Sequence, residues 1–175
     1  RGIAALHQSL GLVGSLNVFE NIFLGQEETR IIGPIQILDK KKMRERAVEL
    51  LNELAIDVPR LEIPVSSMSG GQRQCVAISR LLLDNVNLIL MDEPMAALGV
   101  AEGKKVLDMI ERLKEKGVSV LVISHNLEHV FSIADRIIVL KNGRLVDAVS
   151  PKHVSRTDVV KMITTGESLR SEESV

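Results

Sequence analysis

Apolar residues follow two patterns that alternate along the chain. Short and nearly uninterrupted apolar runs are typical of strands in a parallel sheet that is covered on both faces. They stand at residues 3–6, 88–91, 118–123 and 137–140. Between them, apolar residues three and four positions apart predict helices. These helices cover about residues 18–23, 40–54, 72–83, 101–116, 127–134 and 156–163. Strands that alternate with helices predict an α/β fold with a parallel sheet.

The residues between these runs predict where elements begin and end. Asn17 and Asp39 stand where an N-cap is needed, and Gly117 is placed to end a helix. Asn142-Gly143 is a strong two-residue hairpin signal, with a returning strand over residues 144–149. We expect residues 25–38 to be irregular around a Gly33-Pro34 turn.

The stretch from Ser69 to Pro94 carries the most chemical information. Ser69-Gly70-Gly71-Gln72 opens a predicted helix, whose unpaired N–H groups suit a phosphate. The apolar strand that follows ends in Asp92 and Glu93. One acid can hold Mg²⁺, and the other can polarise a water for attack on phosphorus. Each motif alone is more often a plain turn or strand exit, so the interpretation depends on both together.

Polar side chains stand at the exits of three predicted strands. They are Gln8, the pair Asp92 and Glu93, and His125. The carboxyl ends of parallel strands meet at one edge of a sheet, so we expect these side chains to converge. Alone, a histidine such as His125 is more often a surface or capping residue.

Composition narrows the class of protein. The chain has 175 residues, of which 45% are hydrophobic, as expected of one globular domain. A net charge of −1 argues against nucleic acid as the main partner. The single cysteine, Cys75, excludes an internal disulfide, and together with four scattered histidines it forms no zinc pattern. The sequence opens with Arg1 in a strand already under way, so we expect further residues upstream.

As a set, these motifs resemble the ATP-binding subunit of an ABC transporter. Met68 followed by residues 69–72 resembles the signature loop, and residues 88–93 resemble the Walker B strand with its catalytic glutamate. Gln8 matches the Q-loop glutamine, and His125 matches the switch histidine. Residues 17–25 and 96–99 are similar to ATPases of bacterial simple-sugar importers.

The resemblance implies a P-loop NTPase-type sheet flanked by helices. An ABC ATPase domain would cover residues 1–166, with an α-helical subdomain over about residues 17–83 and a C-terminal β-hairpin. Residues 167–175 would form a disordered tail.

The resemblance also implies a role for each motif. Asp92 would hold Mg²⁺ through water, Gln8 would contact the ion or the attacking water, Glu93 would be the general base, and His125 would bind the γ-phosphate. The signature loop would contact ATP held by a second subunit through Ser69, Gly70, Gly71 and Gln72.

The resemblance implies protein partners as well. They are a second ATPase subunit that closes head to tail, membrane permease subunits and, indirectly, a periplasmic sugar-binding protein. The protein would act at the cytoplasmic face of the membrane, without nucleic acid.

Three departures from the family pattern affect these expectations. Gly99 stands where an aspartate is usual, and Met95 stands where a small hydroxyl residue is usual. The phosphate-binding pattern Gly-x-x-x-x-Gly-Lys-Ser/Thr does not occur in these 175 residues. We therefore expect this stretch alone to bind MgATP very weakly and not to hydrolyse it.

Two alternatives to the sugar-importer ATPase stay open from the sequence. One is a soluble ABC ATPase that acts in repair or translation. The other is a non-catalytic module that keeps the signature loop to complete a partner's ATP site.

Overall fold

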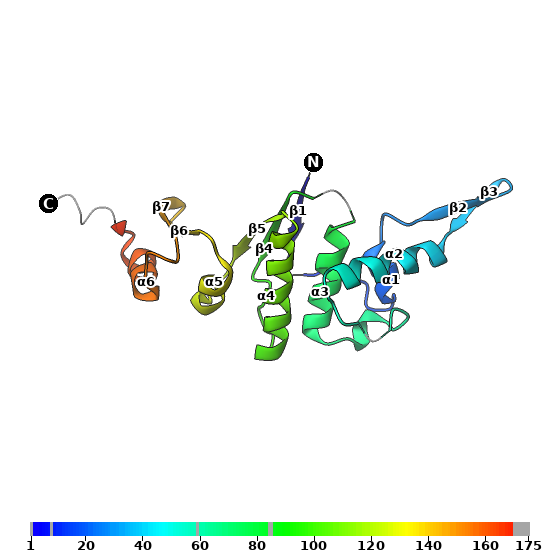
Figure 1. Cartoon of the computed structure of the whole chain (residues 1–175), viewed down its shortest axis with the longest axis horizontal. Helices are drawn as coiled ribbons and strands as arrows, with labels where there is room; N and C mark the ends of the chain where they lie inside the picture. The colour runs from blue at the N-terminus through cyan, green and yellow to red at the C-terminus, as the bar shows by residue number, and fades with distance from the viewer. Residues whose placement is uncertain (1, 8, 59, 84–85, 170–175) are drawn as a thin grey trace. The chain divides into compact units, whose positions relative to one another are not determined.

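The computed structural model describes residues 2–7, 9–58, 60–83 and 86–169. The chain divides into two compact units, residues 1–123 and 124–175. Figure 1 shows the elements of both units in the colours of chain order. The first unit contains β1 (Ile3–Leu6), α1 (Val18–Ile22), β2 (Thr29–Ile32), β3 (Ile35–Leu38), α2 (Lys40–Glu53), a 3₁₀ turn (Val65–Ser67), α3 (Gly70–Leu81), β4 (Leu88–Asp92), α4 (Val100–Glu115) and β5 (Ser119–Ile123). The second contains α5 (Leu127–Ile133), β6 (Ile137–Lys141), β7 (Arg144–Val149) and α6 (Arg156–Thr165).

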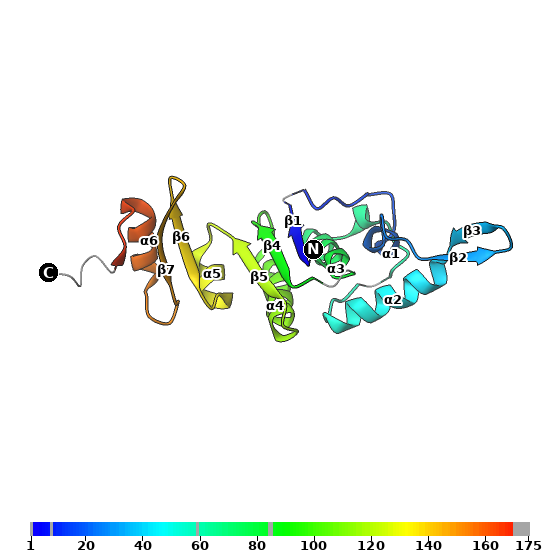
Figure 2. The same cartoon turned by 90° about the horizontal axis from the view of Figure 1, so that it is seen from above.

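A parallel sheet in the order β1-β4-β5 forms the centre of the first unit. Helix α3 packs against β1, and α4 packs against β5 (Figure 2). Alternate residues of the strands, such as Leu6, Ile89 and Met91, are buried. This arrangement confirms the predicted α/β fold with a parallel sheet and flanking helices.

The opposite face of this sheet differs from the sequence expectation. The apolar runs predict cover on both faces, but Ile3, Leu121 and Ile123 are 46–62% exposed. Within the described residues of this unit, helices pack on the face that buries Ile89 and Met91. The described residues of the first unit therefore do not show the predicted cover on the second face.

Helices α1, α2 and α3 enclose a separate hydrophobic core. Its buried side chains come from all three helices and from the turn that precedes α3. They are Val18, Phe19, Ile22, Phe23, Met43, Ala47, Leu51, Val65, Met68 and Val76. The helical spacing in the sequence predicts this packing correctly, and the Asp39 side chain caps α2 by accepting from the Lys42 N–H at 3.0 Å.

Residues 29–38 form a β-hairpin, which corrects the expectation of an irregular segment. Strands β2 and β3 pair around Gly33-Pro34 in antiparallel register, with Ile32 opposite Ile35. Isoleucines on both faces, such as Ile31 at 79% exposure, remove the polar–apolar alternation that usually marks a strand. The missing period explains why the sequence pattern did not reveal the hairpin.

The second unit is built around the antiparallel pair β6–β7. Asn142 and Gly143 both have positive φ values, 49° and 74°, as the predicted two-residue turn requires. Helix α6 packs against both strands and buries Val159 and Met162. The C-terminal hairpin expected from the sequence is therefore confirmed.

Candidate functional site: the signature loop and the end of the Walker B strand

Helix α3 begins with a reciprocal cap. The Ser69 side chain accepts from the Gln72 N–H at 3.3 Å, and the Gln72 side chain accepts from the Ser69 N–H at 3.0 Å. Such a capping box satisfies two donors that a helix start otherwise leaves unpaired. The side chains of Ser69 and Gln72 therefore hold this loop in shape.

The first turns of α3 and α4 approach each other very closely. A Cβ atom added at Gly71 would lie 2.9 Å from the Glu102 Cβ and 3.3 Å from its Cα. One added at Gly70 would lie 2.9 Å from a Leu98 methyl carbon. Glycine is needed at position 71 because the Cα and Cβ of Glu102 leave no room for a side chain, whereas at position 70 the end of the Leu98 side chain can move aside.

The Glu102 carboxylate lies directly on this loop. Its Oε2 lies 3.7 Å from the point that a Cβ atom added at Gly70 would occupy. The nearby Ser69 hydroxyl first, and then the Gly99 and Gly71 backbone, hold the pKa of Glu102 below its ordinary value. Sequence reasoning missed Glu102, although an acid three residues after the N-cap Gly99 is a known helix-start signal.

Strand β4 ends in the two predicted acids. Asp92 is the last strand residue and is exposed, whereas Glu93 is partly buried and has a φ of 48°. The Glu93 N–H donates to the Ile123 carbonyl at 2.9 Å, which extends the pairing with β5. A left-handed backbone costs a residue with a Cβ roughly 1–2 kcal/mol, and such strain is often found at functional sites.

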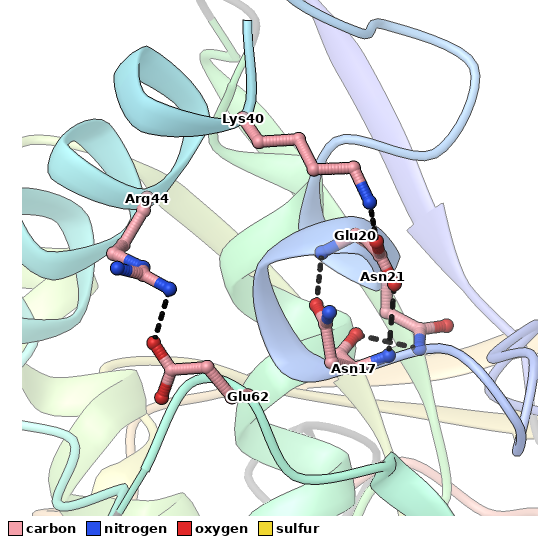
Figure 3. A network of polar contacts seen from close by, with 6 residues as sticks. All are labelled: Asn17, Glu20, Asn21, Lys40, Arg44 and Glu62. Atoms are coloured by element: carbon pink, nitrogen blue, oxygen red, sulfur yellow. Dashed lines mark hydrogen bonds and ion pairs between the residues drawn. The ribbon is translucent and has the colours of Figure 1, made fainter. Parts of the chain in front are cut away.

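A buried asparagine holds the loop that follows β1 (Figure 3). The Asn21 Oδ1 accepts from the Val13 N–H at 2.8 Å, and its Nδ2 donates to the carbonyls of Val13, Leu16 and Asn17 at 3.0–3.1 Å. Arg80 of α3 donates to the Gly11 carbonyl at 3.0 Å. The loop is therefore tied to the same helix that carries the signature motif.

The network around α1 in Figure 3 extends to α2. Asn17 caps α1 by accepting from the Glu20 N–H at 2.9 Å, and Glu20 pairs with Lys40 at 3.0 Å. Arg44 of α2 pairs with Glu62 at 2.7 Å. These contacts anchor the loop to the helical core.

A cavity of about 200 Å³ lies beside the loop that follows β1. It is lined by the end of β1, by the loop itself and by α3, including His7, Ser9 and Arg80. The predicted site residue Gln8 lies outside the described residues. The sequence places it after β1, which ends at Leu6.

His125 belongs to the second unit, where it precedes α5 and is exposed. The Asn126 side chain caps α5 by accepting from the N–H groups of Glu128 and His129. No group of three metal-ligating side chains occurs among the residues that the structure describes. Asp92, exposed at the end of β4, offers carboxylate oxygens of the kind that Mg²⁺ prefers.

Cys75 is buried in α3 beside a cavity of about 130 Å³. Burial raises the pKa of its thiol to about 11 from an ordinary value of 9.0. A thiol with a raised pKa is a poor nucleophile, which supports the packing role predicted for Cys75. In the described part of the chain, no helix is both long and apolar enough to cross a bilayer.

A protein-family model for ABC transporters matches residues 1–96. The chain belongs to the ABC transporter family. Among curated ABC relatives, it is 40% identical over 164 residues to the xylose/arabinose import ATP-binding protein XylG of Sulfolobus acidocaldarius, covering 94% of this chain and 64% of that protein. It is 41% identical over 162 residues to the ribose import ATP-binding protein RbsA of Caldanaerobacter subterraneus subsp. tengcongensis, covering 93% of this chain and 32% of that protein.

Solved ABC structures share this fold. The dimeric ATP-binding cassette MJ0796 in a post-hydrolysis state, bound to ADP and Pi, superposes with a TM-score of 0.66 at 28% identity. That match covers 87% of this chain and 64% of the cassette. The chain therefore spans less than two thirds of the relatives that it matches.

Proposed function

We propose that this chain belongs to an ATP-hydrolysing subunit that drives import of a simple sugar through an ABC transporter. Curated relatives named for import of xylose/arabinose, ribose and fructose are 37–41% identical to the chain over 93–94% of its length. This likeness to three sugar importers is the observation that carries the proposal. Xylose, arabinose, ribose and fructose are accordingly the substrates to test first.

Each predicted site residue has a role in this proposal. Asp92 holds Mg²⁺, which supplies charge neutralisation on the phosphates when bound. Glu93 accepts the proton of the attacking water, and the strained backbone at this position, with φ at 48°, fixes its direction. Gln8 contacts the ion or the water, and His125 contacts the γ-phosphate.

The signature loop acts on a nucleotide held by a second ATPase subunit. Ser69, Gly70 and Gly71 present a hydroxyl and backbone N–H groups at the start of a 12-residue helix, which favours a terminal phosphate. Gln72 holds the loop in shape through its bond to the Ser69 N–H. Two subunits therefore complete each other's sites.

The remaining partners follow from the importer assignment. Permease subunits in the membrane receive the motion, and a periplasmic sugar-binding protein delivers the sugar. The protein would lie at the cytoplasmic face of the membrane, with an ABC ATPase domain over residues 1–166 and a helical subdomain over about residues 17–83.

ATP hydrolysis by the protein assembled with its permease tests this function. Glu93→Gln should lower hydrolysis about 100-fold or more because it removes the general base, while ATP binding persists. Glu115→Gln is the matched control, since Glu115 lies in the last turn of α4 and is exposed. Equal hydrolysis by Glu93→Gln and wild type would contradict the catalytic role, and nucleotide-dependent pairing without hydrolysis by wild type would favour the non-catalytic module.

A further inference from the structure

We propose that Asn21 is a positioning residue for ATP hydrolysis, whose buried amide sets the shape of the loop that follows Gln8. In this proposal, which rests on the proposed roles of Gln8 and of the signature loop, Asn21 acts through the backbone of residues 13–17 and does not itself touch ATP. The evidence comes from the bonds of the amide, from the contacts of the loop and from the apolar surroundings of Asn21.

The Asn21 amide uses both its acceptor and its donors on one turn of the loop. Asn21 is fully buried, at 0% exposure. Its Oδ1 accepts from the Val13 N–H at 2.8 Å, and its Nδ2 donates to the Val13 carbonyl at 3.0 Å. Nδ2 also donates to the carbonyls of Leu16 at 3.1 Å and Asn17 at 3.0 Å (Figure 3). A buried amide bonded in this way specifies one loop conformation, because another conformation would leave its polar atoms unpaired.

The turn held by Asn21 is joined to the segment that leads into the signature loop. The Ser66 N–H donates to the Gly14 carbonyl at 3.2 Å, and the Val65 N–H donates to the Leu16 carbonyl at 3.1 Å. Both donors belong to the 3₁₀ turn that ends immediately before Met68. The Leu16 carbonyl therefore accepts from the buried amide and from this turn, so a displacement of one affects the other.

A second side chain holds the loop nearer to Gln8. The Arg80 guanidinium of α3 donates to the Gly11 carbonyl at 3.0 Å. Gly11 has a φ of 62° and follows Gln8 by three residues. This is a single bond in exposed surroundings, whereas the bonds of Asn21 are made by a buried side chain. Asn21 is therefore the stronger of these two side-chain anchors.

The surroundings of Asn21 favour a role in loop geometry over a role in packing. Helix α1 contributes Val18, Phe19 and Ile22 to the hydrophobic core, and Asn21 is its buried polar residue. An apolar side chain of similar size would fill the same space without the cost of burying an amide. What an apolar side chain would not supply is the set of bonds to the loop backbone.

Hydrolysis by the complete subunit assembled with its permease tests this role. The rate is expressed per ATP site, counted with a non-hydrolysable ATP analogue, so that a loss of folded protein does not lower it. Asn21→Asp keeps the size of the side chain and an acceptor for the Val13 N–H but removes both donor hydrogens. It should lower kcat about tenfold and change the KM for ATP by less than about twofold, because groups around the reacting atoms are misplaced while ATP contacts remain.

Two further variants accompany Asn21→Asp. Val13→Pro removes the N–H that donates to the Asn21 Oδ1, at a side chain that is 40% exposed. It alters the loop without changing the core, and it should lower kcat at an unchanged KM as well. Asn52→Asp makes the same chemical change as Asn21→Asp at an exposed position of α2 and should match wild type.

A double variant shows whether Asn21 acts through Gln8. Gln8→Ala alone should lower kcat. Adding Asn21→Asp or Val13→Pro to Gln8→Ala should lower kcat by less than about twofold more, because residues that act as one unit have non-additive effects. If Asn21 only supported the fold, the two losses would multiply.

Each result decides the proposal. A kcat loss at unchanged KM in the Asn21 or Val13 variant, absent from Asn52→Asp and from the Gln8→Ala background, supports it. A per-site kcat equal to wild type, a rise in KM alone, or losses that multiply with that of Gln8→Ala overturn it. Failure of both variants to fold also overturns it, since the amide would then serve the fold. If hydrolysis depends on Glu93 but not on Asn21, only the positioning role fails and the ATPase assignment stands.

Discussion

The starts of helices α2 and α3 solve the same electrostatic problem in different ways. Helix α2 opens with Lys40, Lys41 and Lys42, so its first turn carries cations at the positive end of the helix. Glu20 and Glu28 from other elements pair with Lys40 at 3.0 Å and with Lys42 at 2.8 Å. Helix α3 has no acid in its own first turn, and Glu102 of α4 packs beside Gly70 and Gly71 instead.

This difference separates an open helix start from a closely packed one. At α2 the acids neutralise side chains, and the first turn remains spacious and exposed, as the 85% exposure of Lys41 shows. At α3 the neighbouring helix approaches so closely that a Cβ added at Gly71 would lie 3.3 Å from the Glu102 Cα. The tightly packed helix start is therefore α3, although the basic run at α2 stands out more in the sequence.

The largest expected effect comes from placing alanine at the second position of each helix. Gly71→Ala should lower the free energy of unfolding by about 1–3 kcal/mol, because its Cβ would overlap Glu102. Lys41→Ala, at the matching position of α2, should change it by no more than about 0.5 kcal/mol. Urea unfolding measures both, and equal values would show that the two helix starts are equally open.

Removing the side-chain N-cap of either helix should lower the free energy of unfolding by a smaller amount, which is similar for the two helices. Ser69→Ala and Asp39→Ala each remove one N-cap bond, to Gln72 and Lys42 respectively, and each should cost about 1 kcal/mol of unfolding free energy. Only Ser69→Ala should also raise the pKa of Glu102 toward its ordinary value, because the nearby Ser69 hydroxyl is the largest cause of its lowered pKa. Carboxyl NMR titration checks this, with Asp39→Ala as the control.

The smallest expected effect is a difference in how the pKa values of Glu28 and Glu102 respond to salt. Hydrogen bonds and ion pairs hold the pKa values of Glu28 and Glu102 below 4.5, so their contributions to stability are present above that pH and are lost as pH falls through the lowered values. Raising NaCl to about 0.5 M should raise the pKa of Glu28 more than that of Glu102, because Glu28 pairs with the cations Lys42 and Arg46. Similar salt responses of the two carboxyl groups would contradict this distinction.

Most elements were predictable because local signals and tertiary packing agree. The cap at Asn17, the separate apolar stripes that include Met43 on α2 and Val76 on α3, and the Asn142-Gly143 turn each specify one structure, and the structure has it. The β2–β3 hairpin was not predictable from its pattern. Its isoleucines stand on both faces of a two-stranded ribbon, so no period marks the strands.

The site was predictable only in part. Residues 69–72 and the pair Asp92 and Glu93 stood out because their chemistry is compressed into short motifs. Glu102 did not, because its contact depends on how closely α4 approaches α3. The role of Asn21 also emerges only when the loop after β1 closes over it.

The buried thiol of Cys75 can report on the opening of helix α3. As the only cysteine, it offers a single reactive handle within the helix that begins at the signature loop. Because burial suppresses the thiolate, alkylating reagents modify the native form slowly and the opened form quickly. The rate at which molecules gain the mass of one alkyl group then measures how often α3 opens, without any engineered label.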